Sequence, residues 1–136
     1  MKNPYCCLLL ACLTAALPVF AQSNIENTRN RKTAKIQYGT ASFYSNKFQG
    51  RPTAMGELYD KNKMTCAHNS LPLGTWIKVT NLRNGKSVTV RVTDRLHHKN
   101  KRLVDLSRIA ASKLGYLSRG LTRVKVEVLG KKHPSV

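Results

Sequence analysis

Two runs of alternating hydrophobic and polar residues lie in the second half of the chain and predict a β-hairpin. The runs are TWIKVT, residues 75–80, and VTVRVTD, residues 88–94, and the segment between them carries Asn84-Gly85. Alternation with a period of two is typical of strands with one buried face, and Asn-Gly is the strongest short-range signal for a two-residue type I′ turn. The pattern therefore predicts that the two runs pair as antiparallel strands.

A two-residue turn at this dipeptide also predicts the register of the hairpin. Counting back from the turn places Val79 opposite Val90 on the buried face and Lys78 opposite Arg91 on the other face. Directly opposed cations repel each other, so we expect the second face to meet an acid or an anionic ligand. The predicted buried face consists of Ile77, Val79, Val90 and Val92.

Shorter patterns before and after the hairpin predict the remaining elements. The segment IQYGTASFYS, residues 36–45, is rich in β-forming residues and predicts a strand. Residues 46–73 carry glycines and prolines typical of a loop, with one helical turn expected at residues 64–67. The segment LTRVKVEVLG, residues 121–130, alternates again and predicts a final strand with its valines inward.

A short helix is predicted between the hairpin and the final strand. Ser107 suits an N-cap, and Gly115 stands where a glycine commonly ends a helix, which leaves about two turns between them. The predicted inward side consists of Leu106, Ala110 and Leu114. Several short strands with so little helix, within residues 36–130, favour a compact β-barrel over a βαβ sheet.

The N-terminal residues 1–21 are predicted to be a secretory signal peptide. They contain Lys2, an apolar stretch and small residues before Ala21, after which we expect cleavage and export to the periplasm. A retained transmembrane helix is one alternative, although the apolar stretch is short and Pro18 interrupts it. Another alternative is lipidation of Cys12, because LLAC matches a lipobox, and this would anchor the protein in the outer membrane.

Two further segments flank the predicted barrel. Residues 22–35 are polar and charged without periodicity and predict a disordered linker, and residues 131–136 form a basic tail. Cleavage after Ala21 removes three of the 4 cysteines and leaves Cys66 alone, so we expect no internal disulfide. Once the predicted signal peptide is removed, the expected mature protein has no transmembrane span.

The charge balance of the chain predicts an anionic partner. The sequence has 24 Lys+Arg against 6 Asp+Glu, and removal of Lys2 with the signal peptide leaves a formal net charge of +17. For an exported protein the candidates are anionic envelope polymers, peptidoglycan carboxylates and lipid head groups. A basic protein can also bind nucleic acid, but the signal peptide and the lack of a recognisable motif disfavour that alternative. We expect a monomer.

Two of the 6 acidic residues, Asp94 and Asp105, lie in the cation-rich stretch RVTDRLHHKNKRLVDLS, residues 91–107. One alternative is structural, with Asp94 in an ion pair with Arg95 or Lys99 and Asp105 at a helix N-terminus. The other is catalytic, because cleavage of a glycosidic bond needs a carboxylic acid to protonate the leaving oxygen. A proton donor near neutral pH needs burial or a neighbouring carboxylate.

Zinc binding is a further alternative for this region. Cys66, His68, His97 and His98 are types of residue that ligate zinc, but their spacing differs from that of standard zinc sites. We therefore expect no metal and no other cofactor. Glu57 has no evident structural role in its glycine-flanked loop, which favours a functional role. His68 is expected either to contact a ligand or to form hydrogen bonds with the loop backbone.

Three collinear stretches of the chain resemble the rare lipoprotein A (RlpA) family. They are YGTASFYSNKFQGRPTAMGELYD, TCAHNSLPLGTWIKVTNLRNGKSVTVRVTDR and RLVDLSRIAASKLGY followed by VKVEVL, which together cover about residues 38–129. The resemblance implies a mainly-β fold, a six-stranded double-psi β-barrel with one or two short helices, distantly related to expansins. It also implies a lytic transglycosylase that acts on peptidoglycan, since some members of the family cleave glycan strands stripped of their peptides.

The family's functional residues fall on particular positions of this chain. Its acid in TASGE.Y falls on Glu57, its histidine in AAHKTLP on His68, and its aspartates in NDRGP and IDLS on Asp94 and Asp105. The resemblance implies catalytic roles for the three carboxylates, with Asp94 as the acid, and a sugar contact for His68. The other residues expected to contact substrate are Tyr44, Thr53 and Arg95.

The chain departs from the family pattern at two motifs. The family's NDRGP is TDRLH here, so the Gly-Pro after Asp94 is missing, and Ser45 replaces the second glycine of GxASWYG. A glycan-binding repeat domain, which many members carry, is not expected. Two alternatives to the enzyme hypothesis therefore remain. The first is a non-catalytic, expansin-like wall-binding module, and the second, more distant one is a nucleic-acid-binding protein.

Overall fold

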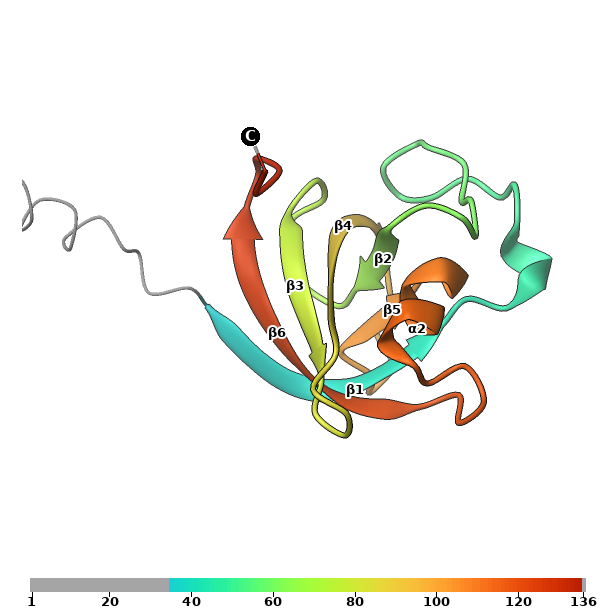
Figure 1. The fold of residues 1–136 in the computed structure, drawn as a ribbon. Helices are drawn as coiled ribbons and strands as arrows, with labels where there is room; N and C mark the ends of the chain where they lie inside the picture. Colours follow the sequence, from blue (N-terminus) through green and yellow to red (C-terminus); the bar gives the residue numbers. More distant parts are fainter. Residues whose placement is uncertain (1–34, 136) are drawn as a thin grey trace, which may run out of the picture. The chain divides into compact units, whose positions relative to one another are not determined.

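The computed structural model describes residues 35–135, in which six strands and two short helices follow one another along the chain (Figure 1). The elements are β1 (Ile36–Phe43), the 3-10 helix η2 (Asn46–Phe48), β2 (Thr65–His68), β3 (Trp76–Asn81), β4 (Ser87–Arg95), β5 (Val104–Leu106), α2 (Arg108–Leu114) and β6 (Thr122–Gly130). Neither helix is long and apolar enough to cross a membrane. The predicted signal peptide and the predicted linker up to residue 34 lie outside the described residues.

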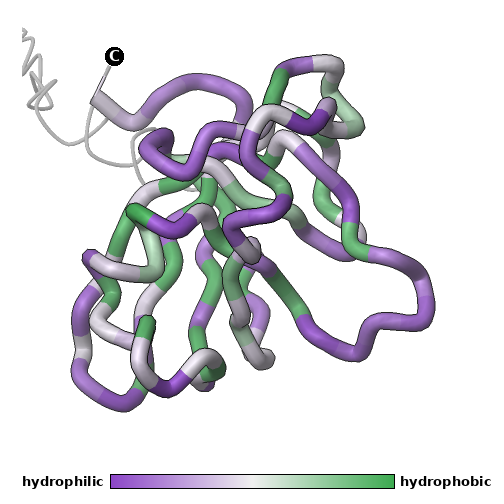
Figure 2. The backbone as a smooth tube through the Cα atoms, turned by 90° about the vertical axis from the view of Figure 1, so that its right-hand side faces the viewer, coloured by the Kyte–Doolittle hydropathy of each residue, from purple (hydrophilic) through white to green (hydrophobic). Residues whose placement is uncertain are grey.

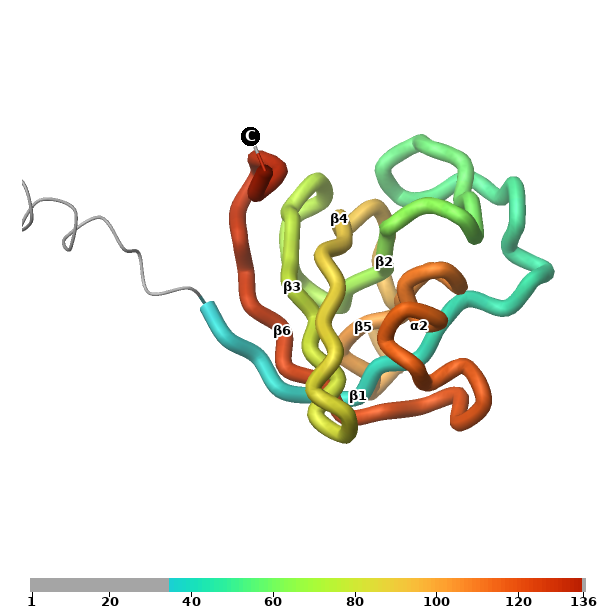
Figure 3. Tube along the Cα trace, in the orientation of Figure 1, coloured from blue at the N-terminus to red at the C-terminus, as the bar shows by residue number. Residues whose placement is uncertain are grey.

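The six strands close into a barrel in the order β1-β5-β2-β4-β3-β6, with β6 returning to β1 (Figure 3). The β1–β5 and β2–β4 pairs are parallel, and the other four pairs are antiparallel. Each parallel pair joins strands that are not consecutive in the chain, so the barrel requires crossover connections. The predicted mainly-β, six-stranded double-psi barrel with short helices is confirmed.

The core of the barrel follows the alternation of the strands. Hydrophobic and hydrophilic positions alternate along the strands in Figure 2, and the long connections are mostly hydrophilic. The fully buried strand residues include Ile77, Val79, Val90, Val92, Val124 and Val126. Val128, which was predicted to point inward, is partly buried against this core. The predicted hairpin face is therefore the core face of the barrel.

Helix α2 begins and ends at the predicted caps. The Ser107 side chain accepts a hydrogen bond from the Ala110 N–H at 3.4 Å, which satisfies one of the free N–H groups of the first turn. Gly115 has a φ of 78°, a left-handed conformation that glycine adopts without strain. Ala110 and Leu114 are fully buried, so the helix packs its predicted side on the barrel.

The register of the β3–β4 hairpin differs from the predicted register by two residues. Lys78 lies opposite Thr89 and not opposite Arg91, so the predicted repulsion between opposed cations is wrong. A shift of two residues keeps every side chain on its predicted face, because side chains alternate with a period of two. Both cations nevertheless lie near acids, since Arg91 pairs with Glu57 and Lys78 stands opposite Glu127 of β6.

The physical reason for the changed register is the buried residue Asn81. Its N–H donates to the Lys86 carbonyl and its carbonyl accepts from the Gly85 N–H, both at 2.8 Å, so a four-residue loop replaces the two-residue turn. Its side chain, in a residue only 1% exposed, donates to the Leu114 carbonyl at 3.0 Å and accepts from the Thr122 hydroxyl at 2.8 Å. These tertiary hydrogen bonds outweigh the local preference of Asn-Gly.

Two short strands were not predicted. The helical turn expected at residues 64–67 is wrong, because Thr65–His68 form β2 between β4 and β5. Neighbours on both sides supply the hydrogen bonds that an extended segment needs when it is buried. Strand β5 has only 3 residues, all buried, and carries Asp105.

Candidate active site

An open groove with a volume of about 640 Å³ lies where the ends of β1 and β4 meet β5. Four of the predicted site residues line it: Tyr44, Asp94, Arg95 and Asp105. Glu57, His68 and Thr53 do not line it. The complete lining consists of Phe43, Tyr44, Ser45, Lys47, Phe48, Arg51, Pro52, Ala67, Asp94, Arg95, Leu96, His97, Asn100, Arg102 and Asp105.

The pairing of β2 with its two neighbours positions both aspartates on the floor of the groove. Ala67 of β2 lies opposite Asp94 of β4 on one side and opposite Asp105 of β5 on the other. Residues that pair across strands share a face, and neighbouring strands lie about 4.8 Å apart, so the two aspartate Cα atoms are roughly 10 Å apart. The small Ala67 side chain leaves the space between the two carboxylates open.

A β-bulge between β2 and β4 places Asp94 opposite Ala67. Cys66 pairs with Val92, but the next residue, Ala67, pairs with Asp94, so Thr93 is passed over in the register. Bulges change the direction of side chains, and they are common beside active sites. Without this irregularity Thr93 would lie opposite Ala67 in place of the aspartate.

The Asp94 carboxylate is held by three hydrogen bonds. Oδ1 accepts from the backbone N–H groups of Ala54 at 3.0 Å and Arg95 at 2.8 Å, and Oδ2 accepts from the Tyr44 hydroxyl at 2.8 Å. Each carboxylate oxygen has two lone pairs, so Oδ1 is fully occupied and Oδ2 keeps one position free. No ion pair to Asp94 is present in residues 35–135, so the structural alternative of a salt bridge with Arg95 or Lys99 is wrong.

Tyr44 is a fixed donor to Asp94. Burial, followed by the hydrogen bond and the charge of Asp94, raises the pKa of the Tyr44 hydroxyl above its usual range, so the hydroxyl keeps its proton. The Tyr44 ring packs against Tyr59, with 4.3 Å between ring centroids, and against Phe48 at 5.6 Å. Aromatic packing therefore holds the hydroxyl at Oδ2.

Asp105 forms an ion pair with Arg102. The Arg102 Nε and Nη2 atoms donate to the two carboxylate oxygens at 2.9 and 3.0 Å, a two-pronged geometry that fixes both groups. The hydrogen bond to Asp105 raises the pKa of Arg102, against the effect of burial. Ser107, and not Asp105, caps α2, and the Asp105 carboxylate bonds to the arginine.

Glu57 and Thr53 belong to the loop beside Asp94. The Glu57 carboxylate pairs with Arg91 at 3.1 Å on the surface. The Glu57 carbonyl accepts from the Thr53 N–H and hydroxyl, both at 2.8 Å, which closes the loop whose Ala54 N–H donates to Asp94. Both residues therefore reach Asp94 through the backbone of this loop.

His68 lies on the opposite side of β2 from the groove. It is fully buried, its Nε2 lies 3.0 Å from Gln37 Oε1, and its Nδ1 accepts from the N–H groups of Ser70 and Leu71, each at 3.0 Å. Burial, with the charges of Arg95 and Lys35, lowers the pKa of His68 to about 4. This arrangement corresponds to the alternative in which His68 organises the loop backbone.

Two cations of the groove, Lys47 and Arg51, were not predicted as site residues. Lys47 and Arg51, which follow β1, line the groove together with Arg95, Arg102 and His97. Lys47 and Arg51 also lie over the Phe48 ring, 5.3 and 5.4 Å from its centroid. Their distance in sequence from Asp94 concealed this arrangement, since only the parallel pairing of the strands brings the two regions together.

The residues considered as zinc ligands are separated in the structure. Cys66 is buried in the core, where burial raises the pKa of its thiol, while the His97 and His98 rings stack on each other on a surface loop with 4.2 Å between centroids. Within the described range, residues 35–135, no three His, Cys, Asp or Glu side chains converge on a common point that could hold a metal ion.

The fold and the groove define a double-psi β-barrel with an acidic floor, formed by Asp94 and Asp105, and a cationic rim, formed by Lys47, Arg51 and Arg95. A family model described as "Lytic transglycolase" matches residues 36–126, and the chain belongs to this family. The resemblance to the RlpA family is thereby confirmed. The matched residues contain all six strands up to Val126 of β6 and both aspartates of the groove floor.

Curated relatives in several bacteria share the barrel. The "Endolytic peptidoglycan transglycosylase RlpA" of Pseudomonas aeruginosa is 57% identical over 98 residues, which cover 72% of this chain and 29% of the relative. The protein of the same name in Neisseria meningitidis is 46% identical over 99 residues, 73% of this chain and 41% of the relative. The chain therefore spans well under half the length of these two curated relatives.

Solved structures with the same fold include proteins that differ in function. The Streptomyces papain inhibitor has a TM-score of 0.56 at 22% identity, over 69% of this chain and 94% of the inhibitor. An expansin from Clavibacter michiganensis has a TM-score of 0.57 at 25% identity, over 73% of this chain and 52% of the expansin. A mutant of that expansin was solved in complex with cellohexaose. These similarities establish the fold.

Proposed function

We propose that the chain is a lytic transglycosylase that cleaves the bond between N-acetylmuramic acid and N-acetylglucosamine in peptidoglycan glycan strands. The proposal is supported by membership of the lytic transglycolase family and by relatives named as endolytic peptidoglycan transglycosylases. The observation that carries it is the single free lone pair on Asp94 Oδ2, on the floor of an open groove. Asp94 is the proposed proton donor.

The reaction needs one acid that also serves as a base. Asp94 gives its proton to the glycosidic oxygen while the C1–O bond breaks, and the 6-hydroxyl of the same muramic acid residue attacks C1. That hydroxyl then returns its proton to the Asp94 carboxylate, which restores the acid and leaves a 1,6-anhydro product. Because the nucleophile is part of the substrate, positioning contributes more than a second activating carboxylate.

Tyr44 remains a hydrogen-bond donor in both protonation states of Asp94. The Tyr44 hydroxyl donates to one lone pair of Oδ2 in both states, because the transferable proton occupies the other lone pair, which is free in the structure. The buried Tyr44 ring keeps the oxygen atom in place during the proton transfer. Tyr44 is thus a positioning residue for the proton donor.

Asp105 and Glu57 support the site without transferring the proton. Asp105 orients the Arg102 guanidinium at the groove, and Glu57 stabilises the loop whose Ala54 N–H donates to Asp94. Neither carboxylate is an unpaired negative charge beside Asp94, since each has an arginine partner. Asp105 and Glu57 therefore do not provide the unpaired neighbouring carboxylate that was expected to tune the donor.

The cationic rim favours glycan strands whose lactyl carboxylates are free. Lys47, Arg51 and Arg95 line the groove without a carboxylate partner in the described part of the chain. Each muramic acid residue that has lost its peptide exposes a carboxylate, which pairs with such cations. The substrate we infer is therefore the peptide-free strand, and the site of action is outside the cytoplasm, after export by the predicted signal peptide.

A non-catalytic wall-binding module is the second candidate, and the expansin fold similarity favours it. That expansin, as a mutant, was solved in complex with cellohexaose. In this alternative the same aspartates and cations hold the glycan, and no bond is broken. The two candidates differ in one observable, the release of anhydro sugars.

The experiment incubates the protein with purified sacculi, with and without amidase pretreatment, and detects products by mass spectrometry. The enzyme hypothesis predicts 1,6-anhydro products, with more release after the peptides have been removed. Binding to sacculi without any release, across the pH range, would contradict the enzyme and support the binding module. Glu127→Gln is a charge-matched control for substitutions of the groove aspartates, because it removes a carboxylate that lies outside the groove and pairs with Lys125.

A further inference from the structure

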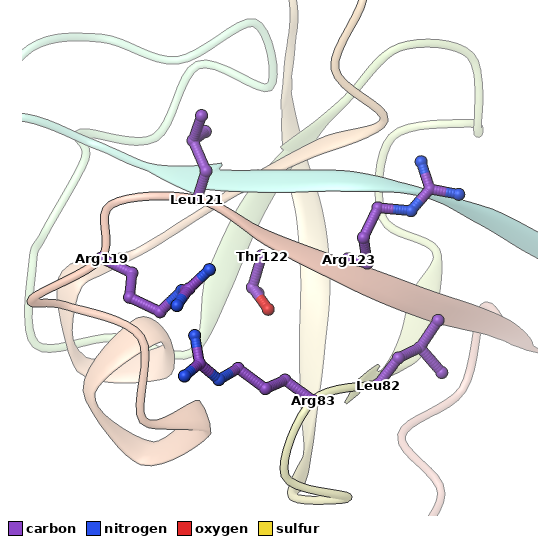
Figure 4. A pocket seen from close by; sticks show the side chains of 6 residues that line it. All are labelled: Leu82, Arg83, Arg119, Leu121, Thr122 and Arg123. Carbon is purple, nitrogen blue, oxygen red and sulfur yellow. The ribbon is translucent and has the colours of Figure 1, made fainter.

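A second hollow, with a volume of about 410 Å³, lies between the β3–β4 loop and the start of β6 (Figure 4). Its lining consists of Leu82, Arg83, Arg119, Leu121, Thr122 and Arg123. Figure 4 shows the guanidinium groups of Arg83 and Arg119 pointing toward each other beside Thr122. We call this set of six residues the arginine pocket. The proposed reaction leaves it without a role.

Buried hydrogen bonds fix the backbone of the arginine pocket. The Asn81 side-chain oxygen accepts from the Thr122 hydroxyl at 2.8 Å and from the Arg83 N–H at 3.0 Å. The Leu82 N–H donates to the Arg123 carbonyl at 3.0 Å, which joins the hairpin loop to β6. The backbone of Leu82, Arg83, Thr122 and Arg123 at the base of the pocket is therefore held in place.

Within the described residues, the three arginines of the pocket form no ion pair with a carboxylate. The ion pairs within residues 35–135 join Arg91 to Glu57, Arg102 to Asp105 and Lys125 to Glu127. The two other carboxylates of this range are engaged elsewhere, Asp94 in the groove and Asp60 with the Asn62 N–H. Guanidinium groups that converge without an acid repel one another, and a bound anion relieves this repulsion.

Two exposed leucines border the cations. Leu82 is 49% exposed and Leu121 is 50% exposed, one on the hairpin loop and the other at the start of β6. An inorganic anion gains nothing from apolar neighbours, whereas a lipid surface accepts leucine side chains at the boundary of headgroups and acyl chains. The combination of free arginines and exposed leucines is therefore complementary to an anionic phospholipid surface.

We propose that the arginine pocket docks the barrel on an anionic phospholipid surface, with the arginines on lipid phosphates and the leucines between headgroups. The pocket lies beside the loop that leads into β4 and the groove near the end of β4, and the seven residue steps from Ser87 to Asp94 span about 23 Å. A barrel docked through the pocket thus presents its groove away from the membrane. This proposal does not depend on catalysis.

The first experiment titrates the full chain with dihexanoyl phosphatidylglycerol and follows amide and arginine side-chain signals by nuclear magnetic resonance. We expect shifts at residues 82–83 and 119–123, with none of similar size at the groove, and no response to dihexanoyl phosphatidylcholine. Inorganic phosphate should perturb the arginines but not the leucine methyl groups. Perturbation of the groove alone, or equal responses to both lipids, would overturn the proposal.

The second experiment measures co-sedimentation with equimolar phosphatidylcholine and phosphatidylglycerol vesicles. A variant with R83Q, R119Q and R123Q should bind roughly a hundredfold more weakly than the parent, since a cation at an anionic surface contributes about fivefold. A control with K61Q, K63Q and K132Q loses the same charge at exposed positions elsewhere and should lose much less binding. All variants keep the N-terminal segment, so its contribution is common to them.

The leucines separate a lipid surface from a soluble polyanion. A variant with L82S and L121S should bind these vesicles severalfold more weakly while its affinity for soluble polyphosphate stays unchanged. Equal binding by the arginine variant and its lysine control would mean that vesicle binding depends on net charge alone. That result would overturn the proposal that the arginine pocket is the docking site. If the leucine substitutions do not change vesicle binding, a lipid surface is not the partner of the pocket, and a soluble polyanion is favoured instead.

Discussion

Acidification should destabilise the barrel through His68. The buried His68 ring accepts two backbone hydrogen bonds at Nδ1, from Ser70 and Leu71, and a proton on that nitrogen removes both. Its pKa is lowered from 6.5 to about 4, with burial as the largest cause and the charges of Arg95 and Lys35 as further causes. The unfolded chain therefore binds a proton at this residue more readily than the folded protein.

The sign and the size of the effect follow from this difference in pKa. The stability contributed by neutral His68 is fully present above about pH 6.5 and is lost as the pH falls toward about 4. A difference of about 2.5 units corresponds to about 3 kcal/mol over the whole range, and at pH 5 the loss is about 2 kcal/mol. Below about pH 4 both states carry the proton and this contribution no longer changes.

The assay is urea unfolding across the pH range, for the parent protein and for His68→Asn. The asparagine oxygen keeps an acceptor near Nδ1 without a titrating group, so the other titrations are common to both proteins. The difference in unfolding free energy between the two should shrink by about 2 kcal/mol between neutral pH and pH 5. A difference that stays constant with pH would refute the role of the buried imidazole.

Three further predictions concern the groove. Tyr44→Phe removes a hydrogen-bond donor to Asp94 and should therefore lower the free energy of unfolding by about 2 kcal/mol, measured by urea unfolding. It should also lower turnover on sacculi about tenfold with an unchanged KM. Arg102→Gln should cost about 2 kcal/mol in urea unfolding, and Arg102→Lys should not restore it, since lysine lacks the two-pronged geometry. Retention of the protein on sacculi should fall steeply with salt, because the screening length drops from about 10 Å at 0.1 M to about 3 Å at 1 M.

Each of these predictions has a contrary result. Full turnover in Tyr44→Phe would show that the hydroxyl does not position the donor. A stable Arg102→Gln variant would show that Asp105 needs no charged partner. Retention on sacculi that does not change with salt would show that stacking and neutral hydrogen bonds dominate over the cationic rim.

The barrel could be predicted from the sequence because its longer strands carry their own signals. Alternation identified the buried face of β3 and β4, and Ser107 and Gly115 delimited α2, since these signals act over a few neighbouring residues. Local signals failed where distant contacts decide the structure. The two-residue turn expected at Asn84-Gly85 is replaced by a longer loop, because the Asn81 side chain forms hydrogen bonds with segments more than 30 residues away in the sequence.

The candidate site was predictable as a set of residues but not as an arrangement. Asp94 and Asp105 become neighbours only because β2 inserts between β4 and β5, and β2 was taken for a helical turn. With that strand unrecognised, nothing in the sequence indicated that Ala67 faces the groove and His68 faces away. The bulge that selects Asp94 over Thr93 likewise depends on long-range pairing, which has no short-range signal.

The most direct test of the account compares wild-type protein and Asp94→Asn on amidase-treated sacculi, with anhydro products and sacculus binding measured in the same samples. Asparagine keeps the shape and the oxygen that accepts the two backbone hydrogen bonds, but it has no proton to transfer at the position of Oδ2. If Asp94 is the proton donor, release falls at least about a hundredfold while binding stays nearly unchanged. Undiminished release by folded Asp94→Asn would contradict the role of Asp94 as proton donor.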